Sequence, residues 1–199
     1  RKKRPGGRHR PPDPSRHLAR TIALAMADPF DTLGLEPRFD LESGVIRRAY
    51  LARVAMVHPD AASGDDLRST AELNVAKQVL EDPERRANLL LSRLGGPSKE
   101  GDKSLPDGFL AGTMEMRERI EEALATGESG SRERVQAEAI ELRAGHVRRV
   151  SDLFRSAISS PNEATLRAIR MELNAWRYVE RLIEQLDPSY DPGTADFKP

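Results

Sequence analysis

The tripeptide His58-Pro59-Asp60 is the part of this sequence best suited to chemistry or recognition. Pro59 has a fixed φ and no backbone N–H, so it stiffens a turn from which the His58 imidazole and the Asp60 carboxylate would project. A plainer interpretation is that Asp60 caps the next helix and that His58 is solvated. The segments on either side of the tripeptide therefore have to decide between these two interpretations.

Other reactive groups are few. The chain has no cysteine, which excludes disulfides, thiolate catalysis and cysteine-ligated metal sites formed by this chain alone, and is compatible with a reducing cytoplasm. His9, His17 and His146 form no ligand or triad spacing with His58, and no glycine loop suited to phosphate is present. No apolar run approaches the ~20 residues that span a bilayer. We expect a cytoplasmic protein without enzyme activity, bound metal or cofactor.

The segments that flank the tripeptide have helical patterns. A short helix is expected from Asp28 to about Gly34, and a longer one is expected to start at a cap on Asp40 and to end before Pro59. The apolar positions of this longer helix follow a period close to 3.6: Leu41, Val45, Ile46, Ala49, Tyr50, Ala52 and Met56. A further helix, about residues 66–80, offers an opposing apolar face through Leu73, Ala76 and Leu80. The tripeptide would then lie in the turn of a helical hairpin.

The rest of the chain also has helical patterns. Pro83 opens a helix that Gly95-Gly96-Pro97 ends, and three longer helices are expected over residues 107–125, 131–158 and 161–186. The last of these, preceded by the cap Ser160 and Pro161, carries a heptad-like seam. Its members are Leu166, Ile169, Leu173, Trp176, Val179, Ile183 and Leu186. These patterns predict an all-α protein whose N-terminal helical hairpin is followed by an antiparallel three-helix bundle.

The first twenty residues differ from the rest in charge. They contain eight Arg or Lys and one Asp, although the whole chain has a net charge of zero. Their Pro, Gly and Arg content is typical of a disordered tail, which could touch nucleic acid or acidic lipid but is more simply a solvated extension. We divide the chain into a basic tail (1–25), an N-terminal helical domain (26–96), a linker (97–106), a three-helix bundle (107–187) and a short tail (188–199).

Two segments resemble the second and third helices of J-domains. They are IRRAYLARVAMVHPD (residues 46–60) and TAELNVAKQVLEDPERRA (residues 70–87). In the second segment, the residues that match that family's IN.AY.VL.DPE.RA pattern are Asn74, Ala76, Val79, Leu80, Asp82, Pro83, Glu84, Arg86 and Ala87. The resemblance implies that residues 26–96 form a J-domain without catalytic activity of its own. It implies docking on a DnaK-type ATP-dependent chaperone, whose ATP hydrolysis is then stimulated, through His58, Pro59, Asp60, Arg47 and Arg48.

The similarity extends to the HscB-type co-chaperones of iron–sulfur cluster assembly. ERRANLLLSRLGG and the later LPDGFLAGTMEMRERIEEAL resemble that subfamily, and the match covers roughly residues 28–187. It implies a C-terminal three-helix bundle that binds an IscU-like scaffold protein, which the co-chaperone delivers to a DnaK- or HscA-type chaperone. The scaffold-binding positions implied by the resemblance are Leu110, Met114, Glu115, Arg117, Glu118 and Tyr178.

Helical geometry also places the packing residues and the implied scaffold-binding residues of this segment on different faces. At 100° per residue, Phe109, Met116, Ile120 and Ala123 share one face and are expected to pack into the bundle. Leu110 and Met114 lie about a quarter-turn or more away, next to charged residues, as in a protein-binding patch. The alternative is that they pack against the J-domain or the linker.

The sequence also departs from the J-domain pattern. Leu51, Ala52 and Met56 occupy positions that usually carry Lys or Arg, and Arg53 stands where a core Leu is common. Two rival functions follow: a J-domain adaptor for an unrelated client, or a helical protein associated with nucleic acid through its basic tail. We expect no membrane partner and give nucleic acid a low weight, whereas self-association is left open.

Overall fold

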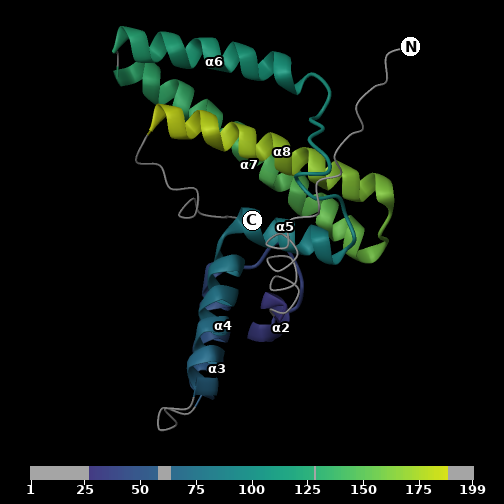
Figure 1. The fold of residues 1–199 in the computed structure, drawn as a ribbon. Coiled ribbons are helices and arrows are strands. Elements are labelled where there is room, and N and C mark those ends of the chain that lie inside the picture. Colours follow the sequence, from purple (N-terminus) through teal and green to yellow (C-terminus); the bar gives the residue numbers. More distant parts are fainter. Residues whose placement is uncertain (1–26, 58–63, 128, 188–199) are drawn as a thin grey trace, which may run out of the picture.

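The computed structural model describes residues 27–57, 64–127 and 129–187, and leaves the side chains of residues 64–67 and 129 undescribed. Within these residues it contains helices and no strand, so the predicted all-α class is confirmed (Figure 1). The helices are α2 (Pro29–Leu33), α3 (Ser43–Val54), α4 (Gly64–Glu81), α5 (Pro83–Arg93), α6 (Phe109–Thr126), α7 (Ser129–Ser159) and α8 (Glu163–Leu186). None of these described helices is long and apolar enough to cross a membrane.

The first two helices begin and end at residues whose chemistry explains the boundaries. The Asp28 carboxylate accepts a hydrogen bond from the Phe30 amide at 2.8 Å, and Gly34 ends α2 in the left-handed region at φ 68°. The predicted start of α3 at Asp40 is wrong, because the N-cap position is Glu42. Leu41, which was expected inside the helix, lies before it and is buried in the core. The N-cap is therefore two residues later than the predicted cap at Asp40.

Helices α3 and α4 form the expected hairpin, which extends away from the long C-terminal helices (Figure 1). Ile46 of α3 is fully buried, and the predicted face of α4 is buried too. That face consists of Leu73, Ala76 and Leu80. The Tyr50 hydroxyl donates to Asn74 Oδ1 at 2.7 Å and joins the two helices at a more exposed level. Ala52 and Met56, which belong to the predicted apolar pattern of this helix, are both exposed, so the buried face of α3 is narrower than that pattern.

Helix α5 connects the hairpin to the rest of the molecule. It starts as predicted at Pro83, with Asp82 accepting a hydrogen bond from the Arg85 amide at 3.0 Å. The Arg86 guanidinium is almost completely buried, and its Nε donates to the Phe39 carbonyl at 2.8 Å. Burial lowers the pKa of Arg86 to about 10, so the group is still charged at neutral pH.

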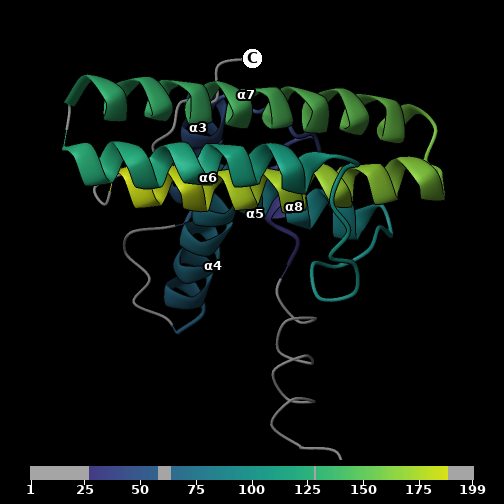
Figure 2. The ribbon, with the colours of Figure 1, turned by 90° about the horizontal axis from the view of Figure 1, so that it is seen from above.

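Helices α7 and α8 form a long antiparallel hairpin, and α6 lies alongside part of it (Figure 2). All seven residues of the predicted α8 seam are buried. The predicted cap at Ser160 and Pro161 is wrong: Asn162 is the N-cap and accepts from the Thr165 amide at 2.9 Å. The Asn162 side chain supplies that bond, and α8 therefore begins at Glu163.

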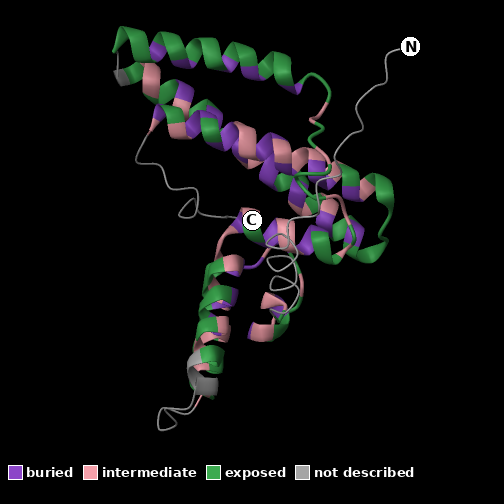
Figure 3. Ribbon diagram, in the orientation of Figure 1, coloured by how far each residue is buried: buried purple, intermediate pink, exposed green. Residues whose placement is uncertain are grey.

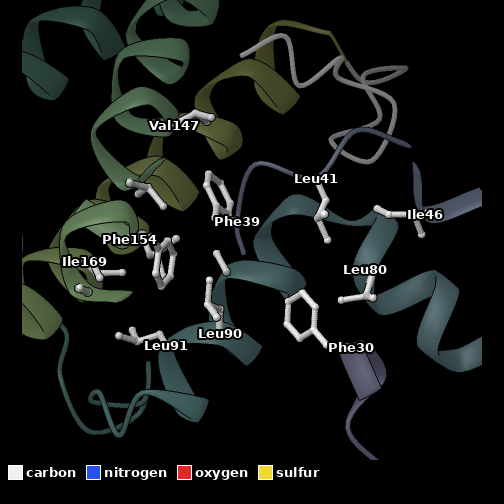
Figure 4. Close-up of a cluster of buried hydrophobic side chains, with 14 of the residues drawn as sticks. Phe30, Phe39, Leu41, Ile46, Leu80, Leu90, Leu91, Val147, Phe154 and Ile169 are labelled. Carbon is white, nitrogen blue, oxygen red and sulfur yellow. The ribbon is translucent and has the colours of Figure 1, made fainter. Parts of the chain in front are cut away.

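Two hydrophobic clusters lie along the α7–α8 hairpin. In the first, α7 and α8 residues near the tip of the hairpin pack against the N-terminal helices (Figure 4). Their buried members are Val147, Val150, Phe154, Ala157, Leu166, Ile169, Leu173 and Trp176. In the second, the opposite half of the hairpin packs against α6. The N-terminal helices thus occupy the half of the hairpin that α6 leaves uncovered, and the two predicted domains share the first cluster.

Candidate functional surfaces

The tripeptide His58-Pro59-Asp60 lies outside the described residues. Helix α3 ends at Val54 and α4 begins at Gly64, so the tripeptide belongs to the connection between the arms of the hairpin, as its position in the sequence predicts.

The arginines of α3 have different surroundings. Arg47 and Arg48, both predicted to bind a chaperone, are exposed on the helix. Arg53 instead extends over the end of α2, where its guanidinium would clash with a Cβ placed on Gly34. The left-handed glycine leaves room for this guanidinium beside the C-terminus of α2, where the helix dipole favours a cation. Arg53 is therefore directed toward α2 and not along the exposed side of α3 that carries Arg48.

Helix α6 separates its apolar residues into two groups (Figure 3). The residues that face α7 and α8 are Phe109, Thr113, Met116, Ile120 and Ala123, all buried, which confirms the face predicted from helical geometry. Leu110 and Met114 are 56% and 64% exposed. The alternative that these two side chains pack against the J-domain or the linker is therefore wrong.

The exposed apolar pair belongs to a longer stripe. Leu110, Met114, Arg117, Glu121 and Leu124 recur at alternating steps of four and three residues, so they lie within about 80° of one another on the helix. Leu124 is 48% exposed. It was not among the predicted site residues, although the same four-three spacing that marks Leu110 and Met114 extends to it.

Tyr178 of α8 packs on Phe109, the first residue of α6. Its ring meets Phe109 edge-on, with the centroids 5.6 Å apart, and the side chain is half-buried. The structure thus brings Tyr178 onto the residue that precedes Leu110, although Phe109 and Tyr178 are 69 residues apart in the sequence.

The other predicted residues of α6 are exposed but do not all share one direction. Arg117 Nε is 3.9 Å from Glu121 Oε1, so two members of the stripe form an ion pair on its surface. Glu118 lies about 40° beyond Met114, whereas Glu115 lies about 100° beyond it. A partner that covers Leu110 and Met114 would therefore reach Glu118 more easily than Glu115.

A partly buried polar network lies beside Phe109 at the N-terminal end of α6. The His146 ring is packed edge-on against Phe109, with centroids 5.5 Å apart, and its Nδ1 lies 2.6 Å from Glu172 Oε2. Arg149 Nε donates to the same oxygen at 3.0 Å. Burial alone raises the pKa of the Glu172 carboxyl, but the hydrogen bonds from His146 and Arg149 outweigh it and hold the pKa below its usual value.

A cleft of about 710 Å³ lies between α5, the connection that follows it and α8. Its lining includes four acidic and four basic side chains, so the charges compensate one another and favour neither anions nor cations. Burial raises the pKa of Glu84 in this cleft, and the nearby Arg177 opposes the rise. Among the described residues, no group of three or more His, Asp and Glu side chains is placed to hold a metal ion.

Comparison with known proteins agrees with the two halves of the fold. Residues 28–89 match the DnaJ domain family, and residues 105–187 match the family described as the HSCB C-terminal oligomerisation domain. A co-chaperone protein HscB homolog from Paraburkholderia xenovorans (strain LB400) is 32% identical over 165 residues, which cover 79% of this chain and 90% of that relative.

Solved structures have the same fold. The chaperone HscB from Vibrio cholerae superimposes with a TM-score of 0.64 at 20% identity, covering 81% of this chain and 96% of that one. The human co-chaperone protein HscB superimposes with a TM-score of 0.66 at 18% identity, covering 82% of each chain. The fold and the hairpin define a J-domain protein with a C-terminal helical bundle. The chain belongs to the HscB family of J-domain co-chaperones.

Proposed function

We propose that this protein stimulates ATP hydrolysis by a DnaK- or HscA-type chaperone and delivers to it an IscU-like scaffold of iron–sulfur cluster assembly. The observation that best supports delivery is the exposed stripe on α6, because Leu110, Met114 and Leu124 are apolar side chains left uncovered on a well-packed bundle. Charged residues border and interrupt the stripe, as at the rim of a protein-binding surface.

The shared core gives delivery a mechanical basis. The J-domain and the bundle are joined through Phe39, Phe154 and Trp176, with ring centroids of Phe39 5.5 Å from Phe154 and 6.2 Å from Trp176. Close-packed interiors have low compressibility, so two domains that share one cannot easily move relative to each other. A scaffold bound on α6 would therefore be held at a fixed distance and direction from the loop that carries His58.

The first experiment measures ATP hydrolysis by a DnaK-type chaperone with increasing amounts of this protein. We expect stimulation by the wild type and a return to the chaperone's basal rate with His58→Gln, because the tripeptide's polar groups would make the stimulating contact. The variant Leu110→Ala with Met114→Ala serves as the control and should stimulate as well as the wild type. Equal stimulation by wild type and His58→Gln would contradict the chaperone-binding part of the proposal.

The second experiment measures the affinity for a purified IscU-like scaffold by calorimetry. Leu110→Ala with Met114→Ala should raise the Kd about tenfold or more, because truncating buried apolar residues at the centre of an interface removes much of its binding energy. Ile140→Ala is a matched control, since Ile140 is an exposed apolar residue on α7 of the same bundle. An unchanged Kd for the double variant would exclude the α6 stripe as the scaffold site.

The two rival functions predict different outcomes in the same assays. An adaptor for an unrelated client would stimulate the chaperone and show no measurable scaffold binding. A protein that acts on nucleic acid through its basic tail would lose nucleic-acid binding when residues 1–25 are removed, whereas chaperone stimulation would survive the deletion.

A further inference from the structure

The cleft between α5, α8 and the connection that follows α5 contains two buried charged groups with incomplete hydrogen bonding. Arg170 and Glu180 of α8 both line this α5–α8 cleft, and they are only 3% and 2% exposed. In the part of the chain that the structure describes, Arg170 Nε and Glu180 Oε2 have no hydrogen-bond partner. Buried polar atoms are normally bonded, so an unbonded donor and an unbonded acceptor on one cleft indicate a ligand that supplies both partners.

Arg170 is a buried cation without an ion pair. Its Nη1 donates to the neutral Asn88 Oδ1 at 2.9 Å, and none of the described carboxylates forms an ion pair with it. Burial lowers the pKa of Arg170, and the charges of Glu84, Asp102 and Glu100 oppose this from a greater distance. Since a buried guanidinium is stabilised best by a carboxylate in direct contact, Arg170 is suited to a carboxylate brought by a ligand.

Glu180 needs a different kind of group. Its Oε1 accepts hydrogen bonds from Trp176 Nε1 at 2.7 Å and from Arg143 Nε, so this carboxylate already has a cation beside it. Only Oε2 lacks a donor. A neutral N–H group, such as a peptide amide, would complete the bonding of Glu180 without adding a second positive charge.

The paired and unpaired charges of the cleft favour one added negative charge. Three of its four carboxylates form ion pairs with arginines: Asp82 with Arg85, Glu84 with Arg177, and Glu180 with Arg143. Arg143 does not itself belong to the lining. The lining charges that form no ion pair with a described residue are those of Arg170, Lys99 and Glu100. One positive charge therefore remains, and a single carboxylate of a ligand would neutralise it.

The distance between the two unbonded atoms sets the length of the ligand. Arg170 and Glu180 are ten residues apart, which corresponds to about 15 Å along α8. An extended chain advances about 3.3 Å per residue, so about four residues cover this length. A free amino acid is too short to reach both groups. The volume of about 710 Å³ is within the range of clefts that hold ligands of this size.

We infer that the α5–α8 cleft binds an extended peptide segment of about four residues from a partner protein, with a carboxylate on Arg170 and a backbone amide donating to Glu180 Oε2. The carboxylate is a chain terminus or an acidic side chain. Such a peptide bridges α5 of the J-domain and α8 of the bundle. No residue of α6 lines the cleft, so the inference goes beyond the proposed function and does not depend on it.

The single tryptophan of the chain gives a direct readout, because Trp176 lines the cleft and donates to Glu180. The experiment follows its indole N–H signal by ¹H–¹⁵N NMR during titration with acetyl-tetraalanine, which has a free carboxylate. We expect a saturable shift, and binding weaker by about tenfold or more for the amidated peptide. The peptide acetyl-Ala-Ala-Ala-Asp-amide tests an acidic side chain as the source of the carboxylate. Binding of either carboxylate peptide supports the inference.

Variants test the two unpaired cations. Arg170→Met keeps a good helix former and removes the buried charge, and it should weaken binding by about tenfold or more. Lys99→Gln, an exposed change that does not depend on core packing, should weaken it by about threefold. Lys103→Gln is the matched control, because Lys103 is an exposed lysine of the same connection outside the cleft lining, and it should bind as wild type does. Circular dichroism establishes that each variant is folded.

Three results would overturn the inference: no saturable shift up to about 5 mM of either carboxylate peptide, equal binding of the tetraalanine acid and its amide together with no binding of the Asp peptide, or full affinity in both Arg170→Met and Lys99→Gln. Sodium acetate and inorganic phosphate are titrated in parallel. If they shift the indole signal as strongly as the peptides do, the cleft is an adventitious anion site only, and the inference is wrong. The ATP-hydrolysis and scaffold-binding assays are separate measurements, so each of these results leaves the proposed function standing.

Discussion

The two halves of the α7–α8 hairpin are covered by different parts of the chain. On one half, the J-domain packs through a cluster in which the Phe39 ring lies beside Phe154 (Figure 4). Trp176 belongs to the same cluster, and the buried Arg86 guanidinium lies over the Phe39 ring. On the other half, the single helix α6 packs through one narrow face, and its neighbouring face is open to solvent (Figure 3). One half therefore joins two domains, and the other supports an exposed surface.

This difference in how the two halves are packed suits the proposed delivery of a scaffold. A helix packed by one face can present Leu110 and Met114 to a partner without weakening the core below it. The J-domain half has the opposite requirement, because a change in its packing would move the hairpin, whose connection we propose as the chaperone-binding loop, relative to α6. The following predictions test this comparison, from the largest expected effect to the smallest.

The largest effect on the free energy of unfolding is expected for Phe154→Ala. Phe154 is 1% exposed and belongs to the cluster that joins α7 to the J-domain, so its truncation leaves a cavity shared by both domains. We expect the free energy of unfolding to fall by about 3–5 kcal/mol, measured by chemical denaturation. Ile158→Ala on the same helix is the control: Ile158 is exposed, and the change should be within about 0.5 kcal/mol.

A second signature of Phe154→Ala concerns coupling. If the shared core makes the two domains one cooperative unit, wild type should unfold in a single transition and the variant should separate into two or approach separation. Two well-separated transitions in the wild type would contradict the proposed rigid connection, whatever the stability of the variant.

A smaller and more local effect is expected for Ile120→Ala in α6. Ile120 is 1% exposed and packs into the second cluster, so a loss of about 2–4 kcal/mol is expected for the structure around α6. Hydrogen exchange should become faster for the amides of α6 and stay unchanged for those of α4 and α5. Faster exchange throughout α4 and α5 would show that the two halves of the hairpin are not energetically distinct.

The sequence predicts much of this fold because most helix boundaries depend on local chemistry. Helix α5 begins at Pro83 because the preceding Asp82 caps it, and α8 ends at Asp187. Both boundaries are set by residues at the boundary itself, so the sequence alone predicts them. The heptad-like seam of α8 is recognisable for the same reason, since every third or fourth residue is apolar and all of them are buried.

What the sequence does not predict depends on distant partners. Ala52 and Met56 continue an apolar pattern but are exposed, because the opposing face of α4 is filled by other residues of α3. Phe39 joins the J-domain to the bundle through Phe154 and Trp176, more than 100 residues away, and no local spacing indicates such a contact. In the candidate scaffold-binding surface, the spacing of Leu110 and Met114 along α6 predicts that they lie off the packing face. The contact between Tyr178 and Phe109 cannot be predicted from spacing, because it joins two different helices.

The smallest effect is expected where the two halves of the hairpin meet. Glu172 accepts hydrogen bonds from His146 and Arg149, and His146 touches Phe109 of α6 while the next residue, Val147, belongs to the J-domain cluster. Because the folded-state pKa of Glu172 is below its usual value of 4.5, its ionised form stabilises the fold. That stabilisation is complete above about pH 4.5 and disappears as the pH falls through the lower folded-state pKa.

Glu172→Gln should therefore lower the free energy of unfolding by about 1 kcal/mol at neutral pH and make stability less dependent on pH below 4.5. Glu141→Gln is the matched control, because Glu141 forms an exposed ion pair with Arg148 on the same hairpin, worth less than about 0.5 kcal/mol. Urea titrations across pH 3–7 provide the measurement. If wild type and Glu172→Gln lose stability in parallel as the pH falls, the junction does not depend on the ionised carboxylate, and apolar packing alone holds the two halves together.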